Sequence, residues 1–402
     1  MGFGVDLFSA TATFASSSFD IGSDLVNSLD FLGHNATKTM SESFYLRHNL
    51  TPIIDGTSKA NSQEISNLHQ IWGALGISIM FFPGIIKIPL PLVYLMHGRN
   101  WLKETLKDFD VRADKKSRRV ESYFFQVTHM LVCPIAIFLG SFSALCKAFL
   151  GKSSEVQKAS TVMVGHEAFF ESFPQILLQC FTIAYGYEVT TVQEVSILAS
   201  FFLLARVAIV YDLMGEQKEL SFRDTMIHTA KVLPAHVTTI IFRVSAFTIT
   251  MVFLREWALV PIFTLYLEIL AISYIKYQHV QDPVLRFRKI WFRSLSNLAV
   301  LNVYDPLNKH GCEKRRCRNF IILSTITAFV HHVIVLTSII LIVFYYPEHF
   351  QHERFEKLVI KPGGDLFFYG FSITYALGIS SLVLCLHLST RILNLTVDVL
   401  EK

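Results

Sequence analysis

Charged residues are scarce in this chain, and several kinds of functional motif are missing. Charged residues make up 17% of the 402 residues, while 52% are hydrophobic and 35 are Phe. This composition is too apolar for an ordinary soluble domain. The sequence contains no Gly-rich phosphate loop, nucleophile elbow or metal pair, so we expect neither an enzyme nor a bound cofactor. The composition instead predicts an integral membrane protein with an all-α fold.

Cysteines are few, and their positions do not indicate disulfides. All of them lie in apolar segments or in one basic loop: Cys133, Cys146, Cys180, Cys312, Cys317 and Cys385. We therefore expect no extracellular disulfide framework. The spacing between His310 and Cys317 matches no standard zinc site, and the cations between them would repel a metal, so no metal is expected. S-palmitoylation of Cys312 or Cys317 stays open.

Windows of about 20 residues predict a polytopic helical bundle with eight transmembrane helices. The predicted spans are 10–32, 68–96, 124–148, 193–214, 232–254, 257–278, 319–346 and 366–390. The first span is the least hydrophobic, because Asp20, Asp24 and Asn27 recur in it at helical spacing. Its opposite face is apolar: Phe14, Ile21, Leu25 and Leu29. It is not expected to be a cleaved signal peptide, because no positive charge precedes it and acids interrupt its apolar run.

Lys and Arg concentrate in two connections, 97–120 and 282–318. Beside transmembrane segments such charges indicate the cytosolic side or attraction to anionic lipid, rather than a nucleic-acid site. Both termini are then cytosolic, and the protein is predicted to be a multi-pass plasma-membrane protein. The loop 33–67 falls outside, and it carries glycosylation sequons at Asn35 and Asn49.

A ninth apolar segment, 163–187, changes the parity of the spans. If it crossed fully, five crossings would separate the two basic connections and place them on opposite sides of the membrane. If it enters and returns on one side, both connections face the cytosol. Pro174 favours such a re-entrant segment, because proline removes a backbone hydrogen bond and breaks a helix. A kinked full span remains the alternative.

This segment also contains a polar stripe. Glu167, Glu171, Gln175 and Gln179 recur every four residues and so follow one side of a helix. One charge near the bilayer centre costs roughly 2.5–3.5 kcal/mol on insertion scales, so this stripe needs a protein-lined, watery or ion-paired environment. An intramembrane stripe of this kind indicates a functional site.

Two arginines, Arg206 and Arg243, also lie in predicted spans, and Glu268 lies in another. The arginines either neutralise acids and hold helices in register, or they take part in a path for a polar substrate. The acids outnumber them, which favours a path. The pair His331 and His332 is more typical of a packing feature.

The segment HEAFFESFPQILLQCFTIAYG resembles the hallmark of the XK-related family, the Kell-associated and apoptotic lipid-scrambling membrane proteins. Glu167, Glu171, Pro174, Gln175 and Gln179 occupy the positions of its Glu-x-x-x-Glu, Pro-Gln and Leu-Leu-Gln pattern. Phe19 to Asp24 is similar to the family's acid pair in the first helix. The resemblance covers the order of spans over most of the chain and weakens after about residue 255.

This resemblance implies two related four-helix halves, here 1–215 and 216–402, with partial-membrane segments. It also implies calcium-independent exchange of phospholipids between leaflets, such as the phosphatidylserine exposure of apoptosis. The expected headgroup path contains Asp20, Asp24, Glu167, Glu171, Gln175, Gln179, Arg206 and Arg243, and Pro174 supplies the helix break. The expected partners are phospholipids, with a membrane subunit or a second copy left open.

The sequence departs from the family members that caspases switch on, because the roughly twelve residues after the last predicted span hold no good caspase site. Two other classes of function also stay open. A solute or ion transporter places acids and broken helices at mid-membrane in the same way. A subunit that transports nothing would carry charges that only pair with each other.

Overall fold

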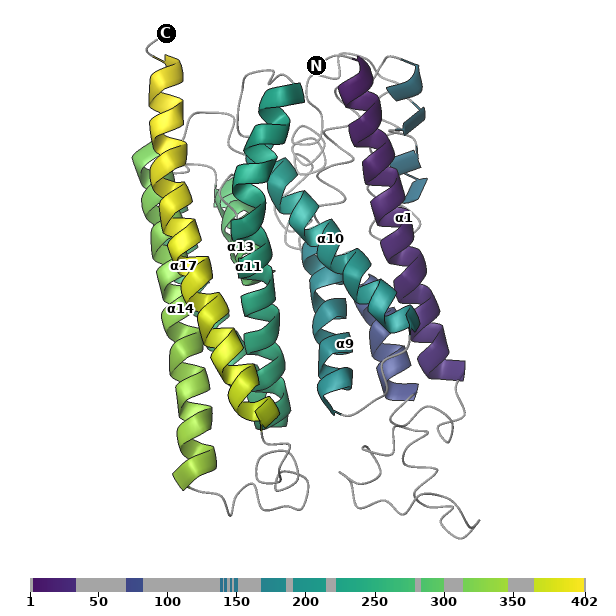
Figure 1. The fold of residues 1–402 in the computed structure, drawn as a ribbon, viewed down its shortest axis with the longest axis vertical. Coiled ribbons are helices and arrows are strands. Elements are labelled where there is room, and N and C mark those ends of the chain that lie inside the picture. Colours follow the sequence, from purple (N-terminus) through teal and green to yellow (C-terminus); the bar gives the residue numbers. More distant parts are fainter. Residues whose placement is uncertain are drawn as a thin grey trace.

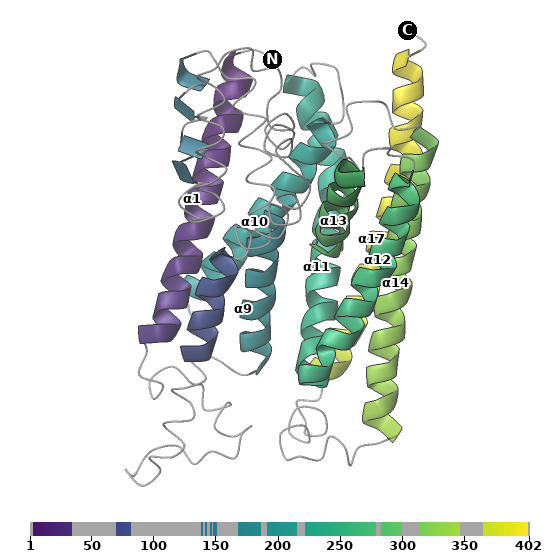
Figure 2. The same ribbon diagram turned by 180° about the vertical axis from the view of Figure 1, so that it is seen from behind.

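The computed structural model describes residues 3–33, 70–81, 168–185, 191–214, 222–278, 283–299, 314–345 and 365–400, together with parts of 138–150. These parts of the chain are helical and contain no strand, which confirms the all-α class. The helices stand side by side as an elongated bundle (Figure 1). The start of α1 and the end of α17 lie at the same end of this bundle in both views (Figures 1 and 2).

The element bounds are α1 Phe3–Gly33, η1 Ala168–Ser172, α9 Phe173–Tyr185, α10 Thr191–Met214, α11 Phe222–Leu254, η2 Arg255–Ala258, α12 Leu259–Tyr277, α13 Pro283–Ala299, α14 Lys314–Tyr345 and α17 Asp365–Leu400. A further short helix covers Gln70–Phe81. The element η1 is a π-helix that leads directly into α9, and η2 is a 3-10 helix between α11 and α12.

Five of the described helices are long and apolar enough to cross a membrane. These stretches are Thr191–Ile209, Thr229–Leu254, Leu259–Tyr277, Ile322–Tyr345 and Gly370–His387, each within or overlapping a predicted span. The chain is therefore a multi-pass helical membrane protein, while the total of eight spans stays a prediction. The predicted span 10–32 falls in α1, whose 31 residues extend about 46 Å. The predicted spans 68–96 and 124–148 are described only in part.

The two faces of α1 are reversed relative to a helix of a soluble protein. Asp20, Asp24 and Asn27 are buried, as their spacing predicts. On the opposite face, Leu25 is 41% exposed and Leu29 is 50% exposed. A polar inner face and an apolar outer face suit a helix whose outer surface contacts lipid.

Two hydrophobic clusters hold the bundle together. The larger cluster joins α9, α10, α11 and α12, and includes Leu203, Ile240 and Leu265. In it the Phe173 ring of α9 meets the Phe247 ring of α11 edge-on, with centroids 6.0 Å apart. The smaller cluster joins α11, α14 and α17 around Leu336. Because α11 contributes to both clusters, it connects the group of α1, α9 and α10 to the group of α14 and α17.

The connection 282–318 differs from the basic loop expected from its charges. Its first part forms α13, which packs along α12 and also contacts η1. Ile290, Ser294 and Asn297 of α13 are buried, whereas Phe287 is exposed and stacks on Trp291. The arginines and lysines lie between apolar residues at helical spacing, so an amphipathic helix forms where charge content alone favours a loop.

Candidate functional site

Two carboxylates of α1 meet two serines of α10 in the interior of the bundle. Ser200 Oγ donates to Asp20 Oδ1 at 2.5 Å, and Ser196 Oγ donates to Asp24 Oδ1. The two aspartates are four residues apart, as are the two serines, so each pair occupies successive turns of its helix. All four side chains are buried. The contacts therefore form a two-step ladder between α1 and α10.

The π-helix η1 completes the surroundings of Asp20. Ser172 Oγ donates to Asp20 Oδ2 at 2.7 Å, so both carboxylate oxygens of Asp20 accept hydrogen bonds from serine hydroxyls. Within the described part of the chain, no arginine forms an ion pair with Asp20 or Asp24. The hydroxyl donors stabilise the carboxylate, but they do not cancel its charge.

Gln179 of α9 joins the second step of the ladder. Its Nε2 donates to Ser196 Oγ at 2.6 Å and lies 3.3 Å from Asp24 Oδ1. Among the described residues, neither Gln179 Oε1 nor Asp24 Oδ2 has a hydrogen-bond partner, although both atoms are buried. Such a site favours a proton, a cation or an ammonium group as an additional partner.

The rest of the predicted stripe lies on the same side of η1 and α9. Glu171 is fully buried in η1, beside Ser172. Gln175 is also buried, and its Nε2 donates to the backbone oxygen of Gly76 at 2.9 Å. This contact places the short helix Gln70–Phe81 against α9, where Trp72 meets Phe181 edge-on at 5.5 Å.

Pro174 lies in the first turn of α9, directly after the π-helix. A proline at this position leaves the carbonyl of Phe170 without its usual α-helical donor, which favours a wider turn. The helix is therefore widened to a π-helix beside Pro174 but continues into α9 without interruption, and the widened turn carries Glu171 and Ser172. Residues 163–167 lie outside the described part of the chain, so the re-entrant path stays a prediction.

Arg206 of α10 extends the polar contacts toward the start of α1. Its guanidinium donates to Ser16 Oγ at 2.6 Å and to Thr13 Oγ1 at 2.5 Å. The inner face of α1 thus presents a row of polar side chains over about four turns: Thr13, Ser17, Asp20, Asp24 and Asn27. We call this set the α1 polar row.

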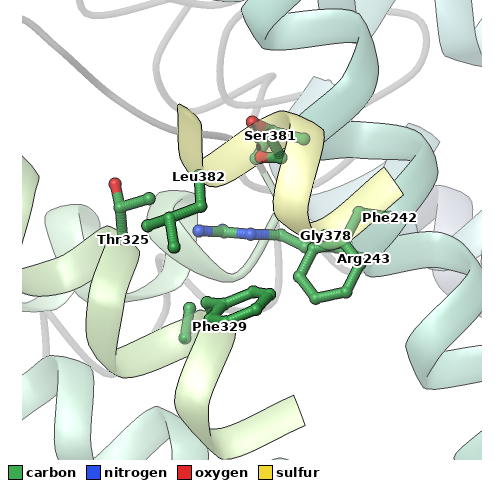
Figure 3. A pocket seen from close by; sticks show the side chains of 9 residues that line it. Phe242, Arg243, Thr325, Phe329, Gly378, Ser381 and Leu382 are labelled. Atoms are coloured by element: carbon green, nitrogen blue, oxygen red, sulfur yellow. Dashed lines mark hydrogen bonds between the residues drawn. The ribbon is translucent and has the colours of Figure 1, made fainter. Parts of the chain in front are cut away.

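Arg243 lies elsewhere in the bundle. It is a buried residue of α11, and it lines a small cavity with residues of α14 and α17 (Figure 3). Nearby, His332 of α14 lies edge-on between the rings of Phe242 and Phe247. His331 Nδ1 lies 3.1 Å from a carboxylate oxygen of Glu268. These groups form a second polar region, separate from the α1 polar row.

The structure thus unites most, but not all, of the predicted site residues. Asp20, Asp24 and Gln179 are linked directly, while Glu171 and Gln175 are their neighbours on η1 and α9. Arg206 contacts the α1 polar row through hydroxyls, whereas Arg243 belongs to the second region. Glu167, Asn35 and Asn49 lie outside the described residues.

Sequence reasoning missed the serines that bind the aspartates. Ser172, Ser196 and Ser200 supply the three hydroxyl contacts to Asp20 and Asp24. A signal was present, because Ser196 and Ser200 repeat the four-residue spacing of Asp20 and Asp24. Serine is common in membrane helices, however, so this spacing gains meaning only once α10 is known to pack on α1.

The residues present define a buried acidic site in a multi-pass helical membrane protein. Among the described residues, no group of three or more His, Cys, Asp or Glu side chains is arranged to hold a metal. No family model and no curated protein sequence matches the chain.

Proposed function

We propose that this protein is a phospholipid scramblase, which moves lipid headgroups across the membrane along the α1 polar row. The observation that carries the proposal is the Asp20–Asp24 ladder. Its two buried carboxylates accept hydrogen bonds from hydroxyl and amide groups, and neither forms an ion pair with an arginine in the described part of the chain. The resemblance of 162–187 to the XK-related family supports the same activity.

Lipid exchange between leaflets meets a high energy barrier. An unaided flip carries a zwitterionic or anionic headgroup through hydrocarbon, where unsatisfied polar and charged groups cost several kcal/mol or more each. Carboxylates of the α1 polar row can bind the choline or ethanolamine ammonium, while Arg206 can bind the phosphate. The acyl chains then stay in the surrounding lipid during the transfer.

The burial of the ladder sets a condition on this path. Asp20 and Asp24 have no exposed surface, so a headgroup reaches them only if α1 separates from α9 and α10. Each broken contact is a hydrogen bond to a charged group, worth about 1.5–3 kcal/mol. The described conformation is therefore the closed one, and a partner, a modification or the bilayer itself would shift the protein toward an open one.

The test is dithionite quenching of fluorescent phospholipids in liposomes that contain the purified protein. Loss of signal beyond the outer leaflet, which holds roughly half of the lipid, reports exchange. We expect Asp24→Asn to slow exchange at least tenfold while the protein stays folded. Ser78→Ala is the control, because its hydroxyl is exposed and bonds only within its own helix, to Ala74. Equal rates in the wild type and Asp24→Asn would contradict the proposal.

A cation transporter is the second candidate, and the buried oxygens favour it. Asp24 Oδ2 and Gln179 Oε1 have no hydrogen-bond partner among the described residues, and oxygen atoms of this kind bind hard cations. A transporter would produce cation flux without lipid exchange, and Asp24→Asn would abolish that flux. If the protein showed no cation flux and no lipid exchange, the result would favour a subunit that transports nothing.

A further inference from the structure

The second polar region contains a small cavity at the junction of α11, α14 and α17. Its volume is about 10 Å³, which is close to the minimum that holds one water molecule. The lining residues are Thr239, Phe242, Arg243, Thr325, Ala328, Phe329, Gly378, Ser381 and Leu382. No carboxylate is among them. Figure 3 shows the Arg243 side chain extending between Leu382 and Phe329 toward Thr325.

Two groups of the lining can donate hydrogen bonds into this cavity. One is the guanidinium of Arg243, which is 3% exposed. The other is the Thr325 hydroxyl, which is buried and has no hydrogen-bond partner among the described residues. The other two hydroxyls are already engaged, because Thr239 donates to the Ala235 carbonyl and bonds to Ser381 at 2.7 Å. The cavity therefore presents donors that suit an anionic oxygen.

The cavity lies just beneath the apolar surface of the bundle. Leu382 and Phe329 are half-buried, and their neighbours Val383 and Val330 are exposed. Gly378 maintains the close approach of α17 to α11, since a Cβ there would lie 2.7 Å from the Phe242 ring. A ligand approaching from the lipid between α14 and α17 would therefore pass only Leu382 and Phe329.

We propose that Arg243 and Thr325 form a phosphate-binding site, distinct from the α1 polar row. One phosphate oxygen occupies the cavity and accepts hydrogen bonds from the guanidinium and from the Thr325 hydroxyl. The remaining phosphate oxygens lie at the apolar surface, where Leu382 and Phe329 must move aside. The phosphate belongs either to the phosphodiester of a phospholipid or to free inorganic phosphate, because both offer the same oxygen.

This site rests on the proposed function only in treating a phospholipid as the natural ligand. Binding can be measured without transport, so the phosphate-binding site and the proposed scrambling can each be disproved without the other. Phosphate and lipid binding that does not depend on Arg243 or Thr325, in a protein that exchanges lipid, would overturn only the Arg243 site. Binding at Arg243 in a protein that exchanges no lipid would overturn only the proposed scrambling.

The experiment has a lipid arm and a phosphate arm, both on the full chain purified in detergent. In the lipid arm, native mass spectrometry measures retention of dioleoylphosphatidylcholine and of dioleoylglycerol, which lacks the phosphate. In the phosphate arm, thermal unfolding is followed in inorganic phosphate and in sodium chloride of equal ionic strength. The variants are Arg243→Gln, Arg243→Lys and Thr325→Val. Thr337→Val is the matched control, because Thr337 is exposed on the same helix and bonds to Tyr375.

For a lipid phosphate we expect Arg243→Gln to weaken retention of phosphatidylcholine at least tenfold, because a hydrogen bond to a charged group is lost. Thr325→Val should weaken it about threefold, and Arg243→Lys should lie between Arg243→Gln and the wild type. Retention of dioleoylglycerol should not change. If phosphate instead raises the unfolding temperature of the wild type and not of Thr325→Val, the site takes free phosphate.

Equal binding of both ligands by the wild type and Thr325→Val, with Arg243→Gln folded and unchanged as well, would overturn the site. If Arg243→Gln does not fold, Thr325→Val decides alone, because valine has the shape of threonine without its donor. An effect of Thr337→Val as large as that of Thr325→Val would also overturn the site, since it would reflect general destabilisation of α14.

Discussion

Asp20 of α1 and Ser200 of α10 lie 2.5 Å apart between Oδ1 and Oγ, although 180 positions separate them in the chain. Asp24 and Ser196 repeat this contact one turn away, with 172 positions between them. Two contacts at the same spacing fix the register of α1 on α10, because a shift by one residue would break both. The ladder is thus a structural element as well as a candidate binding site.

Removing one serine of the ladder should destabilise the protein. We expect Ser200→Ala to lower the free energy of unfolding by about 1.5–3 kcal/mol, because a hydrogen bond to a buried carboxylate is lost. The measurement is thermal or denaturant unfolding in detergent, with Ser78→Ala as the control. Identical stabilities of the two variants would show that the Asp20–Ser200 contact contributes nothing.

Two glycines of the short helix Gln70–Phe81, Gly73 and Gly76, lie against α1, and we expect larger residues at these positions to destabilise the protein. A Cβ at Gly73 would lie 2.6 Å from Leu32 Cγ, and a Cβ at Gly76 would overlap Ser28 Oγ. We expect Gly73→Ala and Gly76→Ala each to cost about 1–3 kcal/mol, the usual cost of overpacking.

Gly22→Ala is the matched control for these glycines, because nothing lies within 4 Å of its added Cβ. It should leave stability unchanged or raise it by up to about 1 kcal/mol, since alanine loses less backbone entropy in a helix. Equal unfolding temperatures for Gly22→Ala and Gly76→Ala would contradict the close packing of Gln70–Phe81 on α1.

Pro174 should maintain the π-helix that carries Glu171 and Ser172. Replacing it by alanine restores a backbone donor and allows η1 to become an ordinary α-helix. The turn would then rotate Ser172 away from Asp20, at a cost of about 1–3 kcal/mol for the lost contact. A double-mutant cycle with Ser172→Ala measures this effect. If the two variants are fully additive, Pro174 does not position Ser172.

The predicted orientation of the chain in the membrane determines which asparagines can carry a glycan. Asn35 comes shortly after α1 in the sequence, while Asn394, which begins the sequon Asn394-Leu395-Thr396, lies in the last turns of α17. The end of α1 and the end of α17 lie at opposite ends of the bundle (Figure 1). We expect Asn35→Gln and Asn49→Gln each to remove one glycan in a mammalian cell, and Asn394→Gln to remove none. Gel mobility before and after glycosidase treatment measures this outcome. A glycan at Asn394 would reverse the predicted orientation.

Helical periodicity was sufficient to predict which residues face the interior near the site. Asp20, Asp24, Glu171, Gln175 and Gln179 are all buried, as their spacing indicates. This prediction works because a carboxylate or an amide in lipid is costly, so the polar side of a membrane helix turns inward wherever it occurs.

The partners of these residues were beyond the reach of periodicity. Ser196 and Ser200 resemble many serines of membrane helices until α10 is placed against α1. Arg243 was grouped with the acids on charge alone, yet it lies among α11, α14 and α17. The helix α13 was missed because its basic residues suggested a loop. The errors at the serines and at Arg243 concern contacts between distant segments, which a local pattern does not contain, whereas α13 was missed because charge content was given more weight than helical spacing.

The inward-facing carboxylates of α1 also bear on how the protein is made. On a ribosome, α1 leaves the exit tunnel long before residues 172 to 200, which supply the donors for Asp20 and Asp24. Until then, each aspartate disfavours entry of α1 into lipid by roughly 2.5–3.5 kcal/mol. The helix α1 therefore depends on segments synthesised after it for stable insertion, and a nascent chain that stalls before α10 would be a substrate for membrane quality control.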